Sequence, residues 1–159
     1  MRKELEQDVW SKFGFVPNNF QALLESPLAA KIYLSAVDHK KDFSTLNFKE
    51  RSLVDYVVSL HHKDEYFIAM HKNFLLQKAE VPSGELALYE WGTRQELEQM
   101  GREGWVVIAT RYILLHHGRE LTAGDLQVFE EHGVSREVWC EIATYVGLKM
   151  TGNIVNNLV

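Results

Sequence analysis

The sequence predicts an all-α protein: a single domain over residues 1–159 with about seven or eight helices. Apolar residues recur at helical spacing along almost the whole chain. The three prolines, at positions 17, 27 and 82, fall where a helix should begin or end. No segment alternates apolar and polar residues for more than a few positions, so no strand is predicted.

The composition is typical of a globular protein, with 46% hydrophobic and 25% charged residues. The longest apolar run, over 105–109, is far shorter than the ~20 residues that cross a membrane. The charged start leaves no room for a signal peptide. Acidic residues outnumber basic ones by 22 to 17, and no basic stripe is present, so we expect neither a membrane segment nor a nucleic-acid partner. The single cysteine, Cys140, favours a cytoplasmic protein.

Two helices are predicted near the N-terminus. Apolar spacing predicts the first over 2–13, followed by a turn over 14–19. Ser26 before Pro27 is typical of an N-cap and a first helical residue. It opens a second helix over about 27–40, whose apolar positions are Leu28, Ile32, Leu34 and Val37.

A capping-box pattern, Asn47 with Glu50, opens the central helical region. Helical spacing of apolar residues continues from there through Leu75. Periodicity alone leaves open whether the chain bends near His61 and His62.

Four further helix starts follow in the C-terminal half. Ser83 is expected to cap a short helix that reaches about Trp91. A capping box over 93–96 opens a long helix that ends at Gly118, and another over 122–125 opens a helix that ends at Gly133. Ser135 caps the last helix. Glycines lie within helical patterns at positions 101, 104, 147 and 152. Each lowers helix stability by ~1 kcal/mol relative to alanine. Close approach of two helices, within the chain or in an oligomer, would compensate for this loss.

A carboxylate and an imidazole fall on an otherwise apolar stripe. On one continuous helix, Val57, Asp64, Phe67 and His71 share a face, and Leu60 flanks it. Polar groups on such a face are unfavourable unless they have partners. An ideal helix separates Asp64 from His71 by about 10 Å, so the two would flank a pocket or meet partners from other helices. The pattern fits equally well a satisfied buried histidine together with a solvated aspartate.

Two other patterns have both a structural and a functional interpretation. His61, His62 and Glu65 share a helix face, which fits surface ion pairing better than metal binding. We therefore expect no metal, and a metal site through these residues or His71 stays a third hypothesis. Cys140 is typical of a small core residue, and it would be reactive only beside positive charge such as Arg136.

Four segments occur in the order and spacing of one known family: 13–19 (FGFVPNN), 46–53 (LNFKERSL), 61–71 (HHKDEYFIAMH) and 129–153. Over residues 13–155 the chain resembles the peroxidase-related branch of the carboxymuconolactone decarboxylase / alkylhydroperoxidase D superfamily. The resemblance implies an alkylhydroperoxidase D-like helical fold. It also implies a homo-oligomer, a trimer or a hexamer.

The redox motif of that branch is a glutamate and two cysteines upstream of a histidine. Anchored on His71, those positions hold Ser52, Asp64 and Phe67, and Glu50 is out of register. The resemblance therefore implies the fold but not the thiol peroxidase chemistry. The cysteine-free segment that ends at His71 looks more like the decarboxylase branch, for which the resemblance implies cofactor-free acid–base chemistry on a carboxylated lactone.

Two hypotheses for the function follow. In the first, His71 is the catalytic acid or base, Asp64 orients it or acts as a second acid, and Ser52 and Tyr56 assist. The substrate is a small molecule, no cofactor takes part, and the apolar pocket is lined by Val57, Leu60 and Phe67. In the second, the protein binds a ligand or assembles without catalysis. A pocket open to His71 and Asp64 would favour the first hypothesis, and one filled by Phe67 would favour the second.

Overall fold

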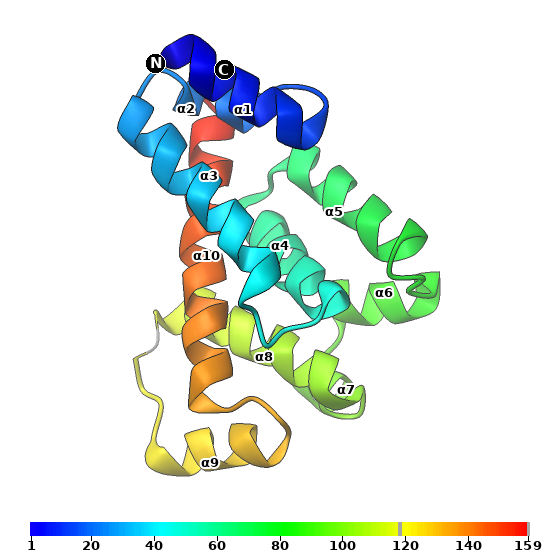
Figure 1. Cartoon of the computed structure of the whole chain (residues 1–159). Coiled ribbons are helices and arrows are strands. Elements are labelled where there is room, and N and C mark those ends of the chain that lie inside the picture. The colour runs from blue at the N-terminus through cyan, green and yellow to red at the C-terminus, as the bar shows by residue number, and fades with distance from the viewer. Residues whose placement is uncertain (118, 159) are drawn as a thin grey trace. The chain divides into compact units, whose positions relative to one another are not determined.

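The computed structural model of the chain confirms the all-α fold class (Figure 1). It describes residues 1–117 and 119–158, apart from the side chain of residue 41. Within these residues there are ten helices, eight of them nine residues or longer, and no strand. None of the described helices is long and apolar enough to cross a membrane. The chain divides into two compact units, residues 1–44 with 150–159, and residues 45–149.

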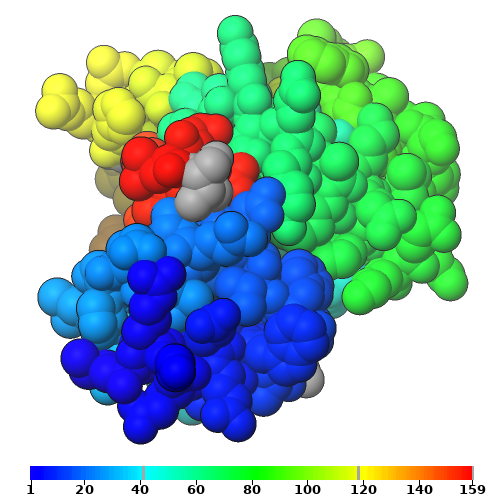
Figure 2. All heavy atoms as spheres, turned by 90° about the horizontal axis from the view of Figure 1, so that it is seen from above, coloured from blue at the N-terminus to red at the C-terminus, as the bar shows by residue number. Residues whose placement is uncertain are grey.

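The first unit contains α1 (Arg2–Phe13), α2 (Asn18–Leu23), α3 (Pro27–Asp42) and the end of α10 (Arg136–Asn156). Figure 2 shows the C-terminal residues, in red, beside the N-terminal segment, in blue. The predicted first helix is confirmed, and Gly14 ends it with a φ of 73°. The predicted turn over 14–19 is too long, because Pro17 adopts an extended conformation and starts α2 at the next residue.

Two of the apolar positions predicted for α3 point to solvent. Leu28 is 70% exposed and Ile32 is 61% exposed, whereas Ala30 and Tyr33 are buried. Tyr33 lies against Gly152 of α10, where an added Cβ would come within 2.4 Å of the tyrosine oxygen. Gly152 therefore permits the close approach that the sequence suggested, and this contact decides which face of α3 is buried.

The second unit is built around α4 (Phe48–His62). Figure 1 shows α4 beside α5 (Glu65–Gln77), α6 (Ser83–Trp91) and α8 (Gly101–His116), and it packs against all three. The unit also contains α7 (Arg94–Glu98), α9 (Ala123–Glu131) and the first part of α10. Because α4 has helices on several sides, many of its side chains are fully buried. Among them are Leu53, Val54, Tyr56 and Val58.

The chain bends directly after α4. Lys63 takes a left-handed conformation with a φ of 55° and ends the helix, and Asp64 then caps the start of α5. The expectation that Val57 and His71 share one face of a continuous helix is therefore wrong. Glu65 lies beyond the bend as well, so it does not share a helix face with His61 and His62.

Several predicted helix boundaries are confirmed and others move. The capping boxes over 93–96 and 122–125 are present, and Gly133 follows α9 with a φ of 83°. The first of these boxes opens only the short α7, because the chain turns again before α8 begins at Gly101. Ser83 is the first residue of α6 and not its cap. The predicted end at Gly118 lies outside the described residues.

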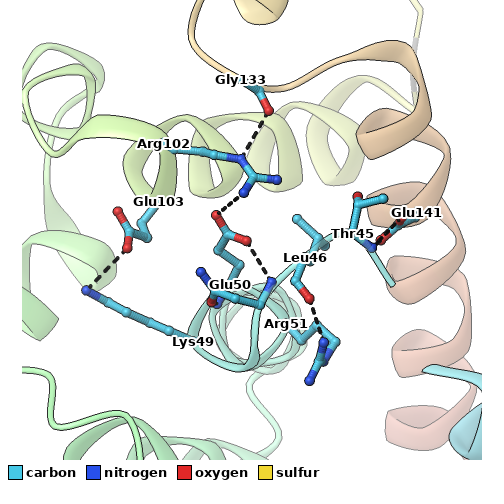
Figure 3. Close-up of polar contacts among 10 residues, drawn as sticks. Thr45, Leu46, Lys49, Glu50, Arg51, Arg102, Glu103, Gly133 and Glu141 are labelled. Carbon is cyan, nitrogen blue, oxygen red and sulfur yellow. Dashed lines mark hydrogen bonds and ion pairs between the residues drawn. The ribbon is translucent and has the colours of Figure 1, made fainter. Parts of the chain in front are cut away.

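A buried carboxylate, Glu50, ties the start of α4 to other elements of the unit (Figure 3). The capping box is complete: Glu50 Oε2 accepts from the Asn47 amide at 2.8 Å, and Asn47 Oδ1 accepts from the Glu50 amide at 2.9 Å. Glu50 Oε1 lies 3.1 Å from Nη1 of Arg102 in α8. Arg102 Nε in turn donates to the carbonyl of Gly133 at 3.1 Å. One carboxylate therefore joins α4, α8 and the turn after α9.

The glycine at position 104 marks the tightest helix contact in this unit. An added Cβ there would lie 1.8 Å from the carbonyl oxygen of Leu97, so only glycine lets α7 and α8 approach this closely. At Gly147 an added Cβ meets no atom within 4 Å, and Gly101 is explained by its φ of 69°. Close helix approach thus accounts for Gly104 and Gly152 but not for Gly101 and Gly147.

The Glu50–Arg102 pair predicts a measurable loss of stability in Glu50→Gln. Glutamine keeps an acceptor for the capping box but removes the charge that Arg102 faces, so we expect the free energy of unfolding to fall by about 2 kcal/mol. Urea unfolding followed by circular dichroism measures the change. The matched control is Glu98→Gln, which removes the exposed pair with Arg94, 2.8 Å long, and should change stability by less than about 1 kcal/mol. Equal small losses in both variants would contradict the role given to Glu50.

Candidate functional site

Three buried ionisable side chains contact Phe67 in the second unit, two of them at its ring and one at its backbone amide. We call Asp64, Phe67, His71 and Lys149 the Phe67 cluster. Asp64 is the N-cap of α5, Phe67 and His71 lie within α5, and Lys149 comes from α10. The exposed fractions are 4% for Asp64, 4% for Phe67, 6% for His71 and 5% for Lys149. Buried ionisable groups are rare unless they are paired, and they gather at functional sites, so this cluster is the candidate site.

Asp64 is held by the helix that it starts. Its Oδ1 accepts a hydrogen bond from the Phe67 amide at 3.1 Å, which is N-cap geometry for α5. The positive end of the helix dipole also favours a carboxylate at this point. The alternative of a solvated aspartate is therefore wrong, because the side chain is buried and its position is set by the backbone of α5.

His71 lies between two phenylalanine rings of its own helix. The Phe67 ring is nearly parallel to the imidazole at 6.1 Å between centroids, and the Phe74 ring meets it edge-on at 5.9 Å. The histidine is thus a buried imidazole in an aromatic setting.

Lys149 is the member of the cluster that sequence reasoning missed. Its Nζ lies 3.0 Å from the centroid of the Phe67 ring, which is a cation–π contact. A signal for it does exist in the sequence, because Lys149 follows the buried Ile142 and Tyr145 at helical spacing. A lysine on the buried face of the last helix is unusual, and it brings positive charge to the ring of Phe67.

The cluster has the groups that an acid–base site requires. An imidazole can accept or donate a proton near neutral pH, and an ammonium group can hold an anionic substrate. The low dielectric around buried groups strengthens both effects.

Tyr56, a predicted catalytic residue, points to a different partner. Its hydroxyl donates to Oε1 of Glu90 in α6, and that oxygen also lies 3.0 Å from Lys72 Nζ. Burial, together with the bond to Glu90 and its charge, raises the pKa of Tyr56 well above its usual range, so the phenol stays protonated. Ser52 is buried in α4. None of the contacts that the structure describes brings Ser52 or Tyr56 to the Phe67 cluster.

Val57 and Leu60 line a pocket of about 220 Å³ between α4, α6 and α8. Its other lining residues are His61, Tyr89, Glu90, Arg111, Leu114 and Leu115. Phe67, the third predicted pocket residue, does not line it, and neither do Asp64 and His71. The residues predicted to form one site therefore belong to two places, the Phe67 cluster and this pocket.

The remaining candidates for chemistry do not form a cluster. In the described part of the chain, no three histidine, cysteine, aspartate or glutamate side chains gather closely enough to hold a metal ion. Cys140 is exposed on α10, so its interpretation as a core residue is wrong.

A comparison of the chain with models of protein families finds no match, and a comparison with curated proteins also finds none. The resemblance to the carboxymuconolactone decarboxylase / alkylhydroperoxidase D superfamily stays a prediction.

The cap geometry predicts different effects for two substitutions of Asp64. Asp64→Ala removes the acceptor for the Phe67 amide, so we expect a loss of about 1 kcal/mol in the free energy of unfolding and faster amide exchange in the first turn of α5. Asp64→Asn keeps the acceptor and should stay close to the parent chain. Urea unfolding and hydrogen exchange measure both effects. If asparagine destabilised the chain as much as alanine, the cap assignment would be wrong.

Proposed function

We propose that the protein is a diverged member of the carboxymuconolactone decarboxylase / alkylhydroperoxidase D group that acts on a small carboxylated molecule by acid–base chemistry with His71. The observation that carries this proposal is the burial of His71, Asp64 and Lys149, each of which contacts Phe67. Thiol peroxidase chemistry is not part of it, because the only cysteine is exposed on a different helix.

The chemistry assigns one task to each ionisable side chain. The ammonium group of Lys149 holds the substrate carboxylate, and Asp64 positions the start of the helix that carries His71. In a carboxylated lactone the bond between the ring carbon and the carboxylate breaks, CO₂ leaves, and the electron pair stays on the carbon. The imidazolium of His71 then donates a proton to that carbon and takes another from solvent.

A second candidate is a ligand-binding protein without catalysis. It is favoured by the phenylalanine rings that cover His71 and by the position of the open pocket, which His71 does not line. In that case the Phe67 cluster is structural and the pocket alone holds the ligand.

The catalytic proposal is tested by substituting His71. With a panel of carboxylated lactones, release of CO₂ is expected from the parent chain, and kcat/KM should fall at least about 100-fold in His71→Gln because a general acid is lost. Cys140→Ser is the control and should retain the activity. Neither the parent chain nor Cys140→Ser should consume peroxide with a dithiol donor.

Three outcomes would contradict this assignment. Turnover that His71→Gln leaves unchanged would remove His71 from the mechanism. Peroxide consumption that disappears in Cys140→Ser would indicate a thiol enzyme. No turnover of any lactone, with saturable binding of the same compounds, would support the binding protein.

We also propose that the chain forms a homo-oligomer, as the resemblance implies. The exposed side chains of Leu28 and Ile32, four residues apart on one face of α3, support this because soluble monomers rarely gather large apolar side chains on one face. Sedimentation equilibrium should give the mass of a trimer or a hexamer. Replacing both Leu28 and Ile32 with serine should lower that mass, and a monomeric parent chain would refute the proposal.

A further inference from the structure

Arg111, a half-buried arginine that forms no ion pair with a carboxylate in the described part of the chain, lies at the pocket between α4, α6 and α8. We infer that this pocket binds a small monocarboxylic acid with an apolar body. The pocket shares no residue with the Phe67 cluster, and the inference does not rest on the function proposed above.

The walls of the pocket are aliphatic. Val57 and Leu60 come from α4, and Leu114 and Leu115 come from α8. Leu114 is 6% exposed and Leu115 is 66% exposed, so Leu115 lies where the pocket opens to solvent. Such walls favour a hydrocarbon chain or an aromatic ring, because its burial removes apolar area from water.

Arg111 supplies a fixed positive charge at the pocket. Its Nη1 donates to the carbonyl of Gly92 at 2.7 Å, and its Nη2 donates to the carbonyls of Tyr89 and Glu90 at 2.9 Å and 3.1 Å. These bonds hold the guanidinium at the end of α6, where the helix dipole favours a cation.

The guanidinium has capacity left for a ligand. It carries five N–H groups, and the three bonds to carbonyls leave two of them for another acceptor. Within the described residues no carboxylate forms an ion pair with Arg111. The carboxylate that lines the pocket, that of Glu90, is paired with Lys72. Burial lowers the pKa of Arg111, but a guanidinium remains charged in proteins.

The charge balance of the pocket therefore favours an anion. Lys72 neutralises the charge of Glu90, to which the hydroxyl of Tyr56 also donates a hydrogen bond, and the positive charge of Arg111 remains. A carboxylate matches the planar fork of an arginine, which explains why an acid is preferred to a neutral molecule of the same shape.

Benzoate and benzamide are the matched probes, because they differ in charge but have nearly the same shape. Titration of the ¹³C-methyl-labelled full chain should show saturable benzoate binding with shifts at Val57, Leu60, Leu114 and Leu115. Benzamide should bind at least about tenfold more weakly, because it cannot replace the missing counter-ion. Equal affinities, no saturable binding of benzoate at millimolar concentration, or shifts confined to other methyl groups would overturn the inference.

Charge changes at the mouth of the pocket test the same point without disturbing Arg111. Leu115→Glu should weaken benzoate binding about threefold or more, and Leu115→Lys should strengthen it, because the charge is added beside the ligand. Leu158→Glu is the matched control, since Leu158 is also an exposed leucine, at 73% against 66% for Leu115. Arg111→Gln should abolish binding, and its circular dichroism spectrum checks that the helix content is unchanged. Identical effects of glutamate at 115 and at 158 would refute the site.

Discussion

The second unit depends on a buried carboxylate at the start of its central helix. Glu50 closes the capping box with Asn47 and faces Arg102 of α8, which also bonds the carbonyl of Gly133. A carboxylate that is 1% exposed is unfavourable unless every acceptor is used, so the pair fixes how α4 and α8 meet. Helices α5, α6 and α8 all pack against α4.

Charge in the apolar interior of this unit is placed according to helix direction. Asp64 lies at the N-terminus of α5, and Arg111 lies at the C-terminus of α6. In each case the helix dipole stabilises the charge, and backbone groups at the helix end form hydrogen bonds with the charged side chain. Both charges are thereby held in place by backbone groups.

Glu90, at the pocket, joins α6 to α4 and α5. Its carboxylate accepts from Tyr56 of α4 and from Lys72, the residue next to His71 on α5. Burial alone would raise the pKa of Glu90, but these two bonds outweigh it and keep the group ionised. The sequence analysis gave Tyr56 a role beside His71, whereas the structure gives it Glu90 as a partner, which no spacing rule indicates because Glu90 is distant in sequence.

The sequence by itself determined the fold class and most helix starts. A helix start can be predicted because its cap depends on residues only three positions apart, as in the capping boxes over 47–50 and 122–125. It also identified His71 as a buried imidazole, since helical spacing reports on one face of one helix. Only the tertiary structure decided the bend at Lys63, the burial of Lys149 and the exposure of Cys140. Each of these depends on which helices pack together, and contacts between residues far apart in sequence leave no periodic signal in the chain.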